Sequence, residues 1–307
     1  MANAHWYGDR SWQTPNLKID NSIKDNFRAG ESSARLHQTV LELLNTKYRD
    51  YQHRYTDGSL SRFGTGIGIH DSESDISLRL PNQCSVFSAE AAAILIATAT
   101  PSSKPLLILS DSASVLAAIQ SQAPKHAWIQ AIIQCSLPST VFMWIPGHCN
   151  IAGNNIADRL AGAGHSGPLH TNRTPLPDVK KWIDKAINTK WQLNWNRNDQ
   201  LFIRKIKQSI GTWNDLKSLR DQRVISRLRT GHTKVSHNMG SSTFRNSCEI
   251  CRIPLSVEHF LCVCPQYELL RNQYNISGSI RDTLGNDAST LEALIHFLKD
   301  ANLYQHI

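Results

Sequence analysis

Four acidic residues lie in four separate short motifs, and their settings point to metal-dependent chemistry. The motifs are Tyr55-Thr56-Asp57-Gly58-Ser59, Ser88-Ala89-Glu90-Ala91, Leu109-Ser110-Asp111-Ser112 and Ile156-Ala157-Asp158-Arg159. Each falls where a strand is expected to end or a helix to pass, so folding can bring the four carboxylates together. Clustered carboxylates repel one another and need cations to stay ionised, and Mg²⁺ is bound by a few carboxylates plus substrate phosphate oxygens. Because two such ions about 3.5–4 Å apart assist phosphodiester cleavage, the pattern predicts a nuclease.

The stretch from Tyr55 to Gly164 resembles a type 1 ribonuclease H domain. Five pieces carry the resemblance, in the family's order and with family-like spacing. They are Tyr55-Thr56-Asp57-Gly58-Ser59, Ala89-Glu90-Ala91, Ser110-Asp111-Ser112, Trp144-Ile145-Pro146-Gly147-His148 and Gly153-Asn154-Asn155-Ile156-Ala157-Asp158. The resemblance implies an enzyme that cuts the RNA strand of an RNA–DNA hybrid with two Mg²⁺ ions, or Mn²⁺. It also implies Asp57, Glu90, Asp111 and Asp158 as metal ligands, with His148 as a mobile auxiliary group.

One branch of the family is most similar, the ribonuclease H of non-LTR retrotransposon polyproteins. The similarity rests on Pro-Gly-His after a strand, a following Gly-Asn-x-x-Ala-Asp helix and a Cys/His cluster near the C-terminus. It implies a retrotransposon origin, with a reverse transcriptase domain expected upstream of this chain. Asn155 departs from the pattern, because many relatives carry Glu there.

Each of these side chains also has a simpler interpretation. Asp57 could cap a turn and Asp111 could cap a helix. Glu90 and Asp158 could be favourable charges near helix N-termini, and His148 could be a surface loop histidine. An Asp inside a strand is disfavoured by propensity, however, and the carboxyl end of a parallel strand, where Asp111 is expected, is where α/β sites gather.

Two further roles follow from the expected reaction. An imidazole titrates near pH 6.5, so we expect His148 to assist the leaving group or product departure rather than to bind metal. RNA is distinguished from DNA through contacts to its 2′-hydroxyls in a shallow minor groove. Gly58, Ser59 and Asn154 are the candidate donors for those substrate contacts.

A second cluster lies near the C-terminus. Cys248-x₂-Cys251-x₇-His259-x₄-Cys264 has the ligand types and spacing of a tetrahedral Zn²⁺ site, and Pro265 follows it. Cys262 is an alternative fourth ligand, and free buried cysteines are the alternative to a metal site. Cys84, Cys135 and Cys149 have no partners at metal-like spacing.

Composition limits the other possibilities. The chain has 307 residues, of which 40% are hydrophobic, so it is globular with room for one ordinary domain and a smaller one. No stretch approaches the roughly 20 apolar residues of a membrane span, and the N-terminus lacks the apolar core of a signal peptide. We therefore expect a nuclear or cytoplasmic protein with reduced cysteines and no membrane partner.

The net charge of +8 is concentrated in one segment. Residues 171–235 hold 15 Lys/Arg against 5 Asp/Glu, whereas residues 1–170 hold 13 of each. A basic segment after a nuclease-like domain suggests a surface that contacts the phosphate backbone. A solvated helical face is the alternative.

Alternation and turn residues predict an α/β fold, a mixed five-stranded sheet flanked by helices. The expected strands are Arg54–Ser59, Thr65–His70, Asp75–Leu80, Leu106–Ser110 and Val141–Ile145. The expected helices are Phe87–Ala99, with Ser88 as its cap, Asp111–Gln120, Lys125–Ser136 and Asn154–Ala163. Further helical patterns occur at Ala34–Leu44, Asp178–Trp195 and Leu216–Leu228.

Four segments follow from these patterns. We expect a partly ordered connector over 1–52, a ribonuclease H domain over 53–165, a basic helical linker over 166–245 and a small zinc-knuckle-like region over 246–307. The leading hypothesis is an active hybrid-specific endonuclease. The alternative is a catalytically inactive retroelement remnant that binds nucleic acid. A transposase or integrase is a third possibility, but those enzymes use three acidic residues in a different order.

Overall fold

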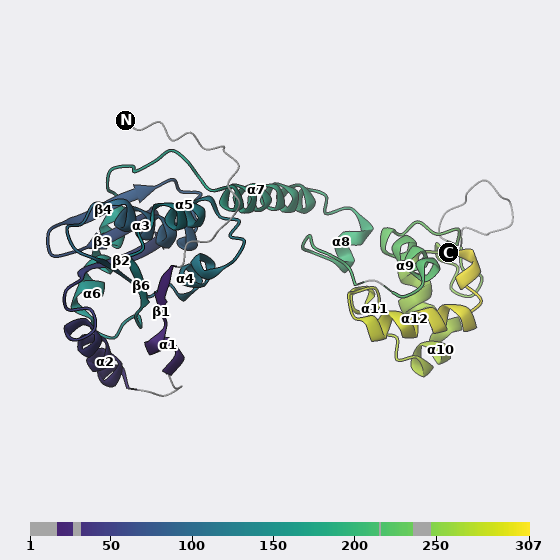
Figure 1. Cartoon of the computed structure of the whole chain (residues 1–307). Coiled ribbons are helices and arrows are strands. Elements are labelled where there is room, and N and C mark those ends of the chain that lie inside the picture. Colours follow the sequence, from purple (N-terminus) through teal and green to yellow (C-terminus); the bar gives the residue numbers. More distant parts are fainter. Residues whose placement is uncertain (1–16, 27–31, 215, 236–246) are drawn as a thin grey trace. The chain divides into compact units, whose positions relative to one another are not determined.

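The computed structural model describes residues 17–26, 32–214, 216–235 and 247–307 (Figure 1). The chain divides into two compact units, Met1–Asp184 and Lys185–Ile307. The first unit contains the sheet, and the described part of the second is helical.

A six-stranded mixed sheet forms the centre of the first unit, with the strand order β1-β6-β5-β2-β3-β4. The strands β2, β3 and β4 are antiparallel, whereas β5 is parallel to β2, and β6 is parallel to β5 and β1. The predicted mixed α/β sheet is confirmed, and one edge strand is added to its five strands. The strands are β1 (Lys18–Asp20), β2 (Gln52–Ser61), β3 (Gly64–His70), β4 (Asp75–Leu80), β5 (Leu106–Ser110) and β6 (Val141–Trp144).

The edge strand β1 comes from the segment that we expected to be a partly ordered connector. Its last residue, Asp20, accepts hydrogen bonds from Tyr48 Oη at 2.5 Å and from Lys47 Nζ at 2.8 Å. Burial would raise the pKa of Asp20, but these hydrogen bonds outweigh it and hold the pKa far below its usual range. These hydrogen bonds join two parts of the same segment, and the parallel pairing of β1 with β6 ties the segment to the sheet.

Helices cover both faces of the sheet, with α3 and α5 on one side and α2 and α6 on the other (Figure 1). The strand β5 shows why both faces need cover. Leu106 and Ile108 share a buried cluster with α3 and α5, whereas Leu107 and Leu109 share one with α2. A parallel strand that is apolar at every position must be buried on both sides. The helices of this unit are α1 (Ser22–Asn26), α2 (Ser33–Asn45), α3 (Val86–Ala99), α4 (Ala113–Gln120), α5 (Ala127–Cys135) and α6 (Ala152–Gly164).

The helix α3 begins earlier than expected, because Ser85 rather than Ser88 caps it. The side chain of Ser85 accepts a hydrogen bond from the backbone N–H of Ser88. Ser88 itself is fully buried inside the helix, where its hydroxyl lies 2.9 Å from Nε2 of His126. A hydroxyl that has a buried partner elsewhere is not available as a cap, so the expectation for Ser88 was wrong.

Two glycines allow helices to approach the sheet closely. A Cβ atom at Gly68 of β3 would lie 2.0 Å from the carbonyl oxygen of Ala157 in α6. A Cβ atom at Gly58 of β2 would lie 2.4 Å from the backbone nitrogen of Glu90 in α3. Any larger residue would move these helices away from the strands that face them.

The second unit has its own hydrophobic core. Residues from 206 to 307 contribute to one buried cluster that includes Leu228, Phe260, Leu294 and Phe297. The predicted linker and the predicted tail thus both take part in one core, while the four segment boundaries stay predictions. Its helices are α8 (Phe202–Ile206), α9 (Leu219–Thr230), α10 (Glu268–Gln273), α11 (Ile280–Thr283) and α12 (Ala288–Asp300), and α7 (Leu176–Arg197) crosses the division between the units. No helix in the described ranges is long and apolar enough to cross a membrane.

A buried ion pair joins β2 to the end of β3. Arg54 Nε donates to Asp71 Oδ2 at 2.8 Å, and its guanidinium also donates to the carbonyl oxygens of Ala97, Thr100 and Pro101. Both partners are buried, with Arg54 2% and Asp71 6% exposed. Burial would raise the pKa of Asp71, but hydrogen bonds from Arg54 and two backbone N–H groups lower it below its usual value. The pair therefore stabilises the fold at neutral pH, and this contribution is lost as the pH falls through the acid range.

Replacing Asp71 by Asn should destabilise the protein by about 3–5 kcal/mol, because it leaves the Arg54 guanidinium buried without its counter-charge. The matched control is Asp75→Asn, since Asp75 pairs with His70 at 2.6 Å but its side chain is 54% exposed. That exposed pair should contribute only about 0–1 kcal/mol. Urea unfolding of both variants measures the difference, and equal losses would contradict the assignment of Arg54–Asp71 as a structural pair.

Candidate active site and metal centre

The parallel register of two strands brings the first two predicted carboxylates together. Thr56 of β2 pairs with Ser110 of β5, so the next residues, Asp57 and Asp111, follow side by side at the ends of the paired segments. Asp57 lies within β2, as predicted, and Asp111 directly follows β5. Asp57 is 9% exposed, and Asp111 is partly buried.

The helix α3 supplies the third carboxylate. Glu90 is 6% exposed, and Gly58 lets the backbone of α3 approach β2 at this point. Carboxylate oxygens of Asp57, Glu90 and Asp111 all lie within 4.8 Å of one another. Within the described ranges, Glu90 Oε2 is buried and has no hydrogen-bond partner. A buried carboxylate oxygen without a donor is a position that a cation can satisfy.

Burial and mutual repulsion make these carboxylates difficult to ionise. Burial raises the pKa of Glu90 to about 9, and the charges of Asp57 and Asp111 add to the effect. Burial likewise raises the pKa of Asp57 to about 6, with further contributions from Asp111 and Asp158. The backbone N–H of Gly58 partly offsets both shifts. Oxygen ligands with crowded negative charge suit a hard divalent cation, so the three residues fit such an ion.

The fourth predicted ligand, Asp158, does not join the group of three. It is the seventh residue of α6 rather than an early one, and it is exposed. The rotation of α6 about its axis explains why Asp158 is exposed. Ala157 packs against Gly68 and Ala161 packs against Gly66, so these residues face the sheet. The residue after Ala157 is turned about 100° away from the sheet. Asp158 is still near enough for its charge to raise the pKa of Asp57.

The loop after β6 carries His148 next to the carboxylates. A Cβ atom at Gly147 would lie 2.8 Å from Asp111 Oδ2, so the loop passes directly against that carboxylate. His148 is exposed and has a positive φ of 57°. Burial raises the pKa of Asp57 and of Asp111, and the charge of His148 opposes both shifts, which places the imidazole within electrostatic reach of both carboxylates.

The three candidate substrate contacts have different surroundings. Asn154 is 5% exposed, and its side chain makes a hydrogen bond to Asp111. Asn154 therefore orients the Asp111 carboxylate. We did not predict this role, although the position of Asn154 one helical turn before Asp158 is a signal for it. Ser59 is half-buried on β2, and the N–H of Gly58 is directed at Asp57 and Glu90. Only Ser59 of the three is left without an assigned contact inside the site.

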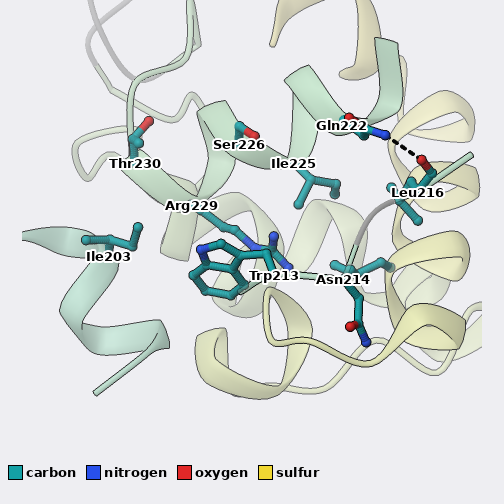
Figure 2. A pocket seen from close by; sticks show the side chains of 10 residues that line it. Ile203, Trp213, Asn214, Leu216, Gln222, Ile225, Ser226, Arg229 and Thr230 are labelled. Atoms are coloured by element: carbon teal, nitrogen blue, oxygen red, sulfur yellow. Dashed lines mark hydrogen bonds between the residues drawn. The ribbon is translucent and has the colours of Figure 1, made fainter. Parts of the chain in front are cut away.

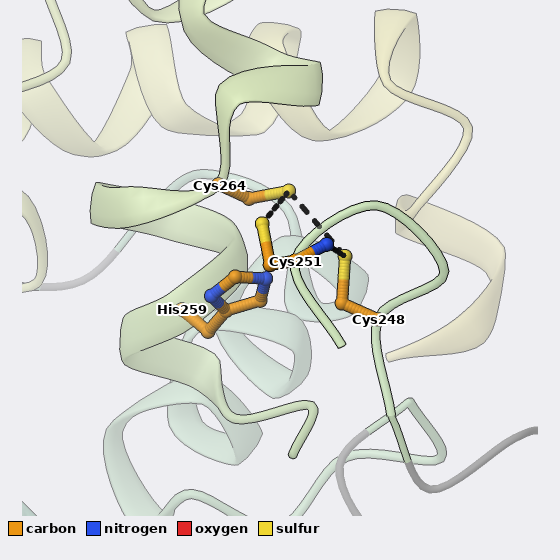
Figure 3. A group of neighbouring side chains, drawn as sticks. All are labelled: Cys248, Cys251, His259 and Cys264. Carbon is orange, nitrogen blue, oxygen red and sulfur yellow. Dashed lines mark hydrogen bonds between the residues drawn. The ribbon is translucent and has the colours of Figure 1, made fainter. Parts of the chain in front are cut away.

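The four predicted tail ligands converge in the second unit (Figure 3). Their ligand atoms lie within 4.8 Å of one another, and Cys264 Sγ is 3.8 Å from Cys248 Sγ and 4.0 Å from Cys251 Sγ. A tetrahedron with metal–sulfur bonds of about 2.3 Å has edges of about 3.75 Å, which matches these separations. His259 is 3% exposed, and neither of its ring nitrogens has a hydrogen-bond partner among the described residues. The four residues thus fit a tetrahedral metal ion.

Local structure explains how the four residues meet. A tight turn closes Cys248 to Ile253, with the N–H of Cys251 donating to Cys248 Sγ. That N–H and the side chain of His259 lower the pKa of Cys248 to about 6, which favours the thiolate that a metal requires. A π-helical turn, His259–Val263, then presents His259 and Cys264 to the turn. Cys262, the alternative fourth ligand, lies outside the group and hydrogen-bonds Thr283.

A hollow of about 240 Å³ in the second unit gathers part of the basic segment (Figure 2). The guanidinium carbon of Arg229 lies 3.7 Å from the centre of the Trp213 ring, and Lys207 Nζ lies 4.2 Å from it. Trp213 and Arg229 line the hollow together with Asn214, Ser226 and other residues, whereas Lys207 is not part of its lining. Arg229 is 6% exposed, and its guanidinium donates to the carbonyl oxygens of Leu284 and Gly285, so this cation takes part in the packing of the second unit.

Replacing Glu90 by Gln should stabilise the protein in the absence of divalent ions. The folded-state pKa of about 9 lies above the ordinary value of 4.5, so wild-type stability falls as the pH rises between these values. Gln has the same shape and no charge, so the variant should gain ~2–4 kcal/mol at pH 8 and much less at pH 5. Thermal unfolding with a chelator at both pH values measures this. A gain that is equal at the two pH values would contradict the electrostatic explanation.

Comparison with known proteins bears on the first unit. No curated protein matches the chain. The sequence model of the RNase H family matches residues 50–166, a range that holds all four predicted carboxylates and His148. Together with the mixed sheet and the buried carboxylates, this match identifies residues 50–166 as an RNase H domain.

Proposed function

We propose that the protein hydrolyses the RNA strand of RNA–DNA hybrids at the site formed by Asp57, Glu90 and Asp111, with Asp158 as a fourth ligand. An RNase H domain indicates a hybrid ribonuclease in general. The observation that carries the specific proposal is the group of three carboxylates within 4.8 Å, of which Asp57 and Glu90 are buried. Such a group is unfavourable unless a divalent cation compensates its charge.

The carboxylates would hold two Mg²⁺ ions, or Mn²⁺, which when bound activate a water and neutralise charge on the scissile phosphate. The protein's contribution is to hold the carboxylates in place. Asp57 is fixed by the β2–β5 register, Glu90 by the close packing of α3, and Asp111 by its hydrogen bond from Asn154. Asp158, which faces solvent from α6, would close the site on the open side.

His148 has a different role in this proposal. His148 is exposed, lies within electrostatic reach of Asp57 and Asp111, and is not part of the buried group. An imidazole in this position can give a proton to the leaving oxygen or help the cleaved strand to depart.

We also propose a retrotransposon origin, with a reverse transcriptase domain upstream, and a Zn²⁺ ion in the tail. The order of motifs in the RNase H domain and the converging Cys/His group support this origin. The zinc assignment is supported by the tetrahedral sulfur separations and by the two unpartnered nitrogens of His259 within the described part of the tail.

Replacing Asp57 by Asn should abolish Mg²⁺-dependent cleavage of a labelled RNA–DNA hybrid while preserving the fold. The change keeps the shape of the side chain and removes charge that holds the ions, so the loss should be at least about 10³-fold. Asp75→Asn on β4, two strands away from β2 in the sheet, is the matched control and should cleave normally. Near-normal activity of Asp57→Asn would remove Asp57 from the site. A wild-type protein that binds the hybrid but never cuts it would favour the inactive nucleic-acid-binding alternative.

Replacing Cys251 by Ser should lower the zinc content of the purified protein from about one ion per chain and loosen the tail, because metal binding in a small region contributes folding energy. Cys262→Ser is the matched control, since Cys262 lies beside the group but outside it. Metal analysis and limited proteolysis measure both effects. A wild-type tail that is free of metal and resistant to protease would contradict the zinc assignment, and equal losses in both variants would contradict the choice of Cys251.

A further inference from the structure

The helix α2 lies outside the range that matches the RNase H family, yet it packs beneath the loop that carries His148. The matched range begins at residue 50, whereas α2 spans Ser33–Asn45. Leu36, Val40 and Leu44 of α2 are buried in one cluster with residues of β5, β6 and the loop that follows β6. The loop contributes Ile145, Cys149 and Ile151 to this cluster. The two segments therefore share a core, although more than 100 residues separate them in sequence.

A specific hydrogen bond accompanies this packing. Nδ1 of His37 in α2 lies 3.0 Å from the carbonyl oxygen of Cys149, a separation of 112 residues along the chain. A carbonyl oxygen can only accept, so Nδ1 of His37 carries the proton and donates. Cys149 directly follows His148, and its carbonyl is held from outside the family-matched range.

The backbone around this carbonyl adopts conformations that need such support. His148 and Asn150, on either side of Cys149, both have a φ of 57°. Non-glycine residues rarely adopt positive φ, and they do so where the surrounding structure fixes them. Cys149 is 7% exposed, so its buried side chain and its bonded carbonyl form the anchor between two left-handed residues.

We infer that His37 is a positioning residue, which holds the Cys149 carbonyl and thereby orients His148 over the carboxylates of the active site. This inference rests on the proposed function, because it assigns to α2 a part in hybrid cleavage. His37 touches neither substrate nor the reacting atoms and acts only through the loop. The functional RNase H domain accordingly extends at least to α2, beyond the family-matched range.

The test compares two substitutions of His37 in the full chain. His37→Phe keeps a ring of similar size and removes the donor, whereas His37→Asn keeps an N–H close to the position of Nδ1. His37→Phe should lower kcat for hybrid cleavage about 10-fold with little change in KM, because small misplacement of a reacting group is costly. His37→Asn should restore kcat to within about 3-fold of wild type, since it keeps the hydrogen bond. If His37→Phe does not fold, as judged by its Tm, His37→Ala replaces it.

A double-substitution cycle separates positioning from a general structural effect. In a His148→Ala background, His37→Phe should cause no further loss of kcat, because the group that it positions is absent. An additive loss, or a wild-type kcat in His37→Phe, would overturn the inference. The inference would also be overturned if the only effect of His37→Phe were a lower Tm.

A measurement independent of activity keeps this inference distinct from the proposed function. Hydrogen–deuterium exchange in the peptide covering residues 145–151 should rise in His37→Phe and stay near wild type in His37→Asn. Unchanged exchange in His37→Phe would overturn the positioning role even in an active enzyme. If the wild-type chain does not cleave the hybrid, the proposed function and the catalytic consequence of this contact both fail, while the exchange data still decide whether His37 orders the loop.

Discussion

The burial and mutual repulsion of carboxylates beside the paired strands β2 and β5 are the constraint on which the RNase H domain depends. The β2–β5 register places Asp57 next to Asp111, and α3 adds Glu90. Burial is the larger cause of the raised pKa values of Asp57 and Glu90, and repulsion adds to it. Without a bound cation the site is therefore electrostatically unfavourable. The stability of the folded domain and the affinity of the site for a divalent cation are linked for this reason.

Such a site requires rigid surroundings, and the packing of the sheet provides them. Gly58 and Gly68 allow α3 and α6 to lie nearly backbone to backbone on the strands, so neither helix can shift without a clash or a gap. The buried guanidinium of Arg54 adds a second restraint, because it joins β2 to Asp71 and to the C-terminal end of α3. The strand that carries Asp57 and the helix that carries Glu90 are thus held by one side chain.

The sequence predicted those parts of the fold whose signals are local. The strands Asp75–Leu80 and Leu106–Ser110 were predicted with their observed bounds, because alternation or a continuous apolar run marks each. The cap of α3 was missed because Ser88 has its partner in His126, 38 residues away. The exposure of Asp158 was missed for a similar reason. Contacts with Gly66 and Gly68 set the rotation of α6, and no pattern within the helix specifies them.

The segment before residue 50 shows most clearly which parts of the fold cannot be predicted from local sequence patterns. A three-residue edge strand has too short a pattern to recognise, and its hydrogen bonds to Lys47 and Tyr48 depend on the folded chain. Yet α2 covers the face of the sheet formed by Leu107, Leu109 and Met143. Without α2 these apolar side chains would face water, which costs about 25 cal/mol for each Å² exposed. The family match marks the residues that carry the chemistry, whereas the physical domain must also include the helix that covers their sheet.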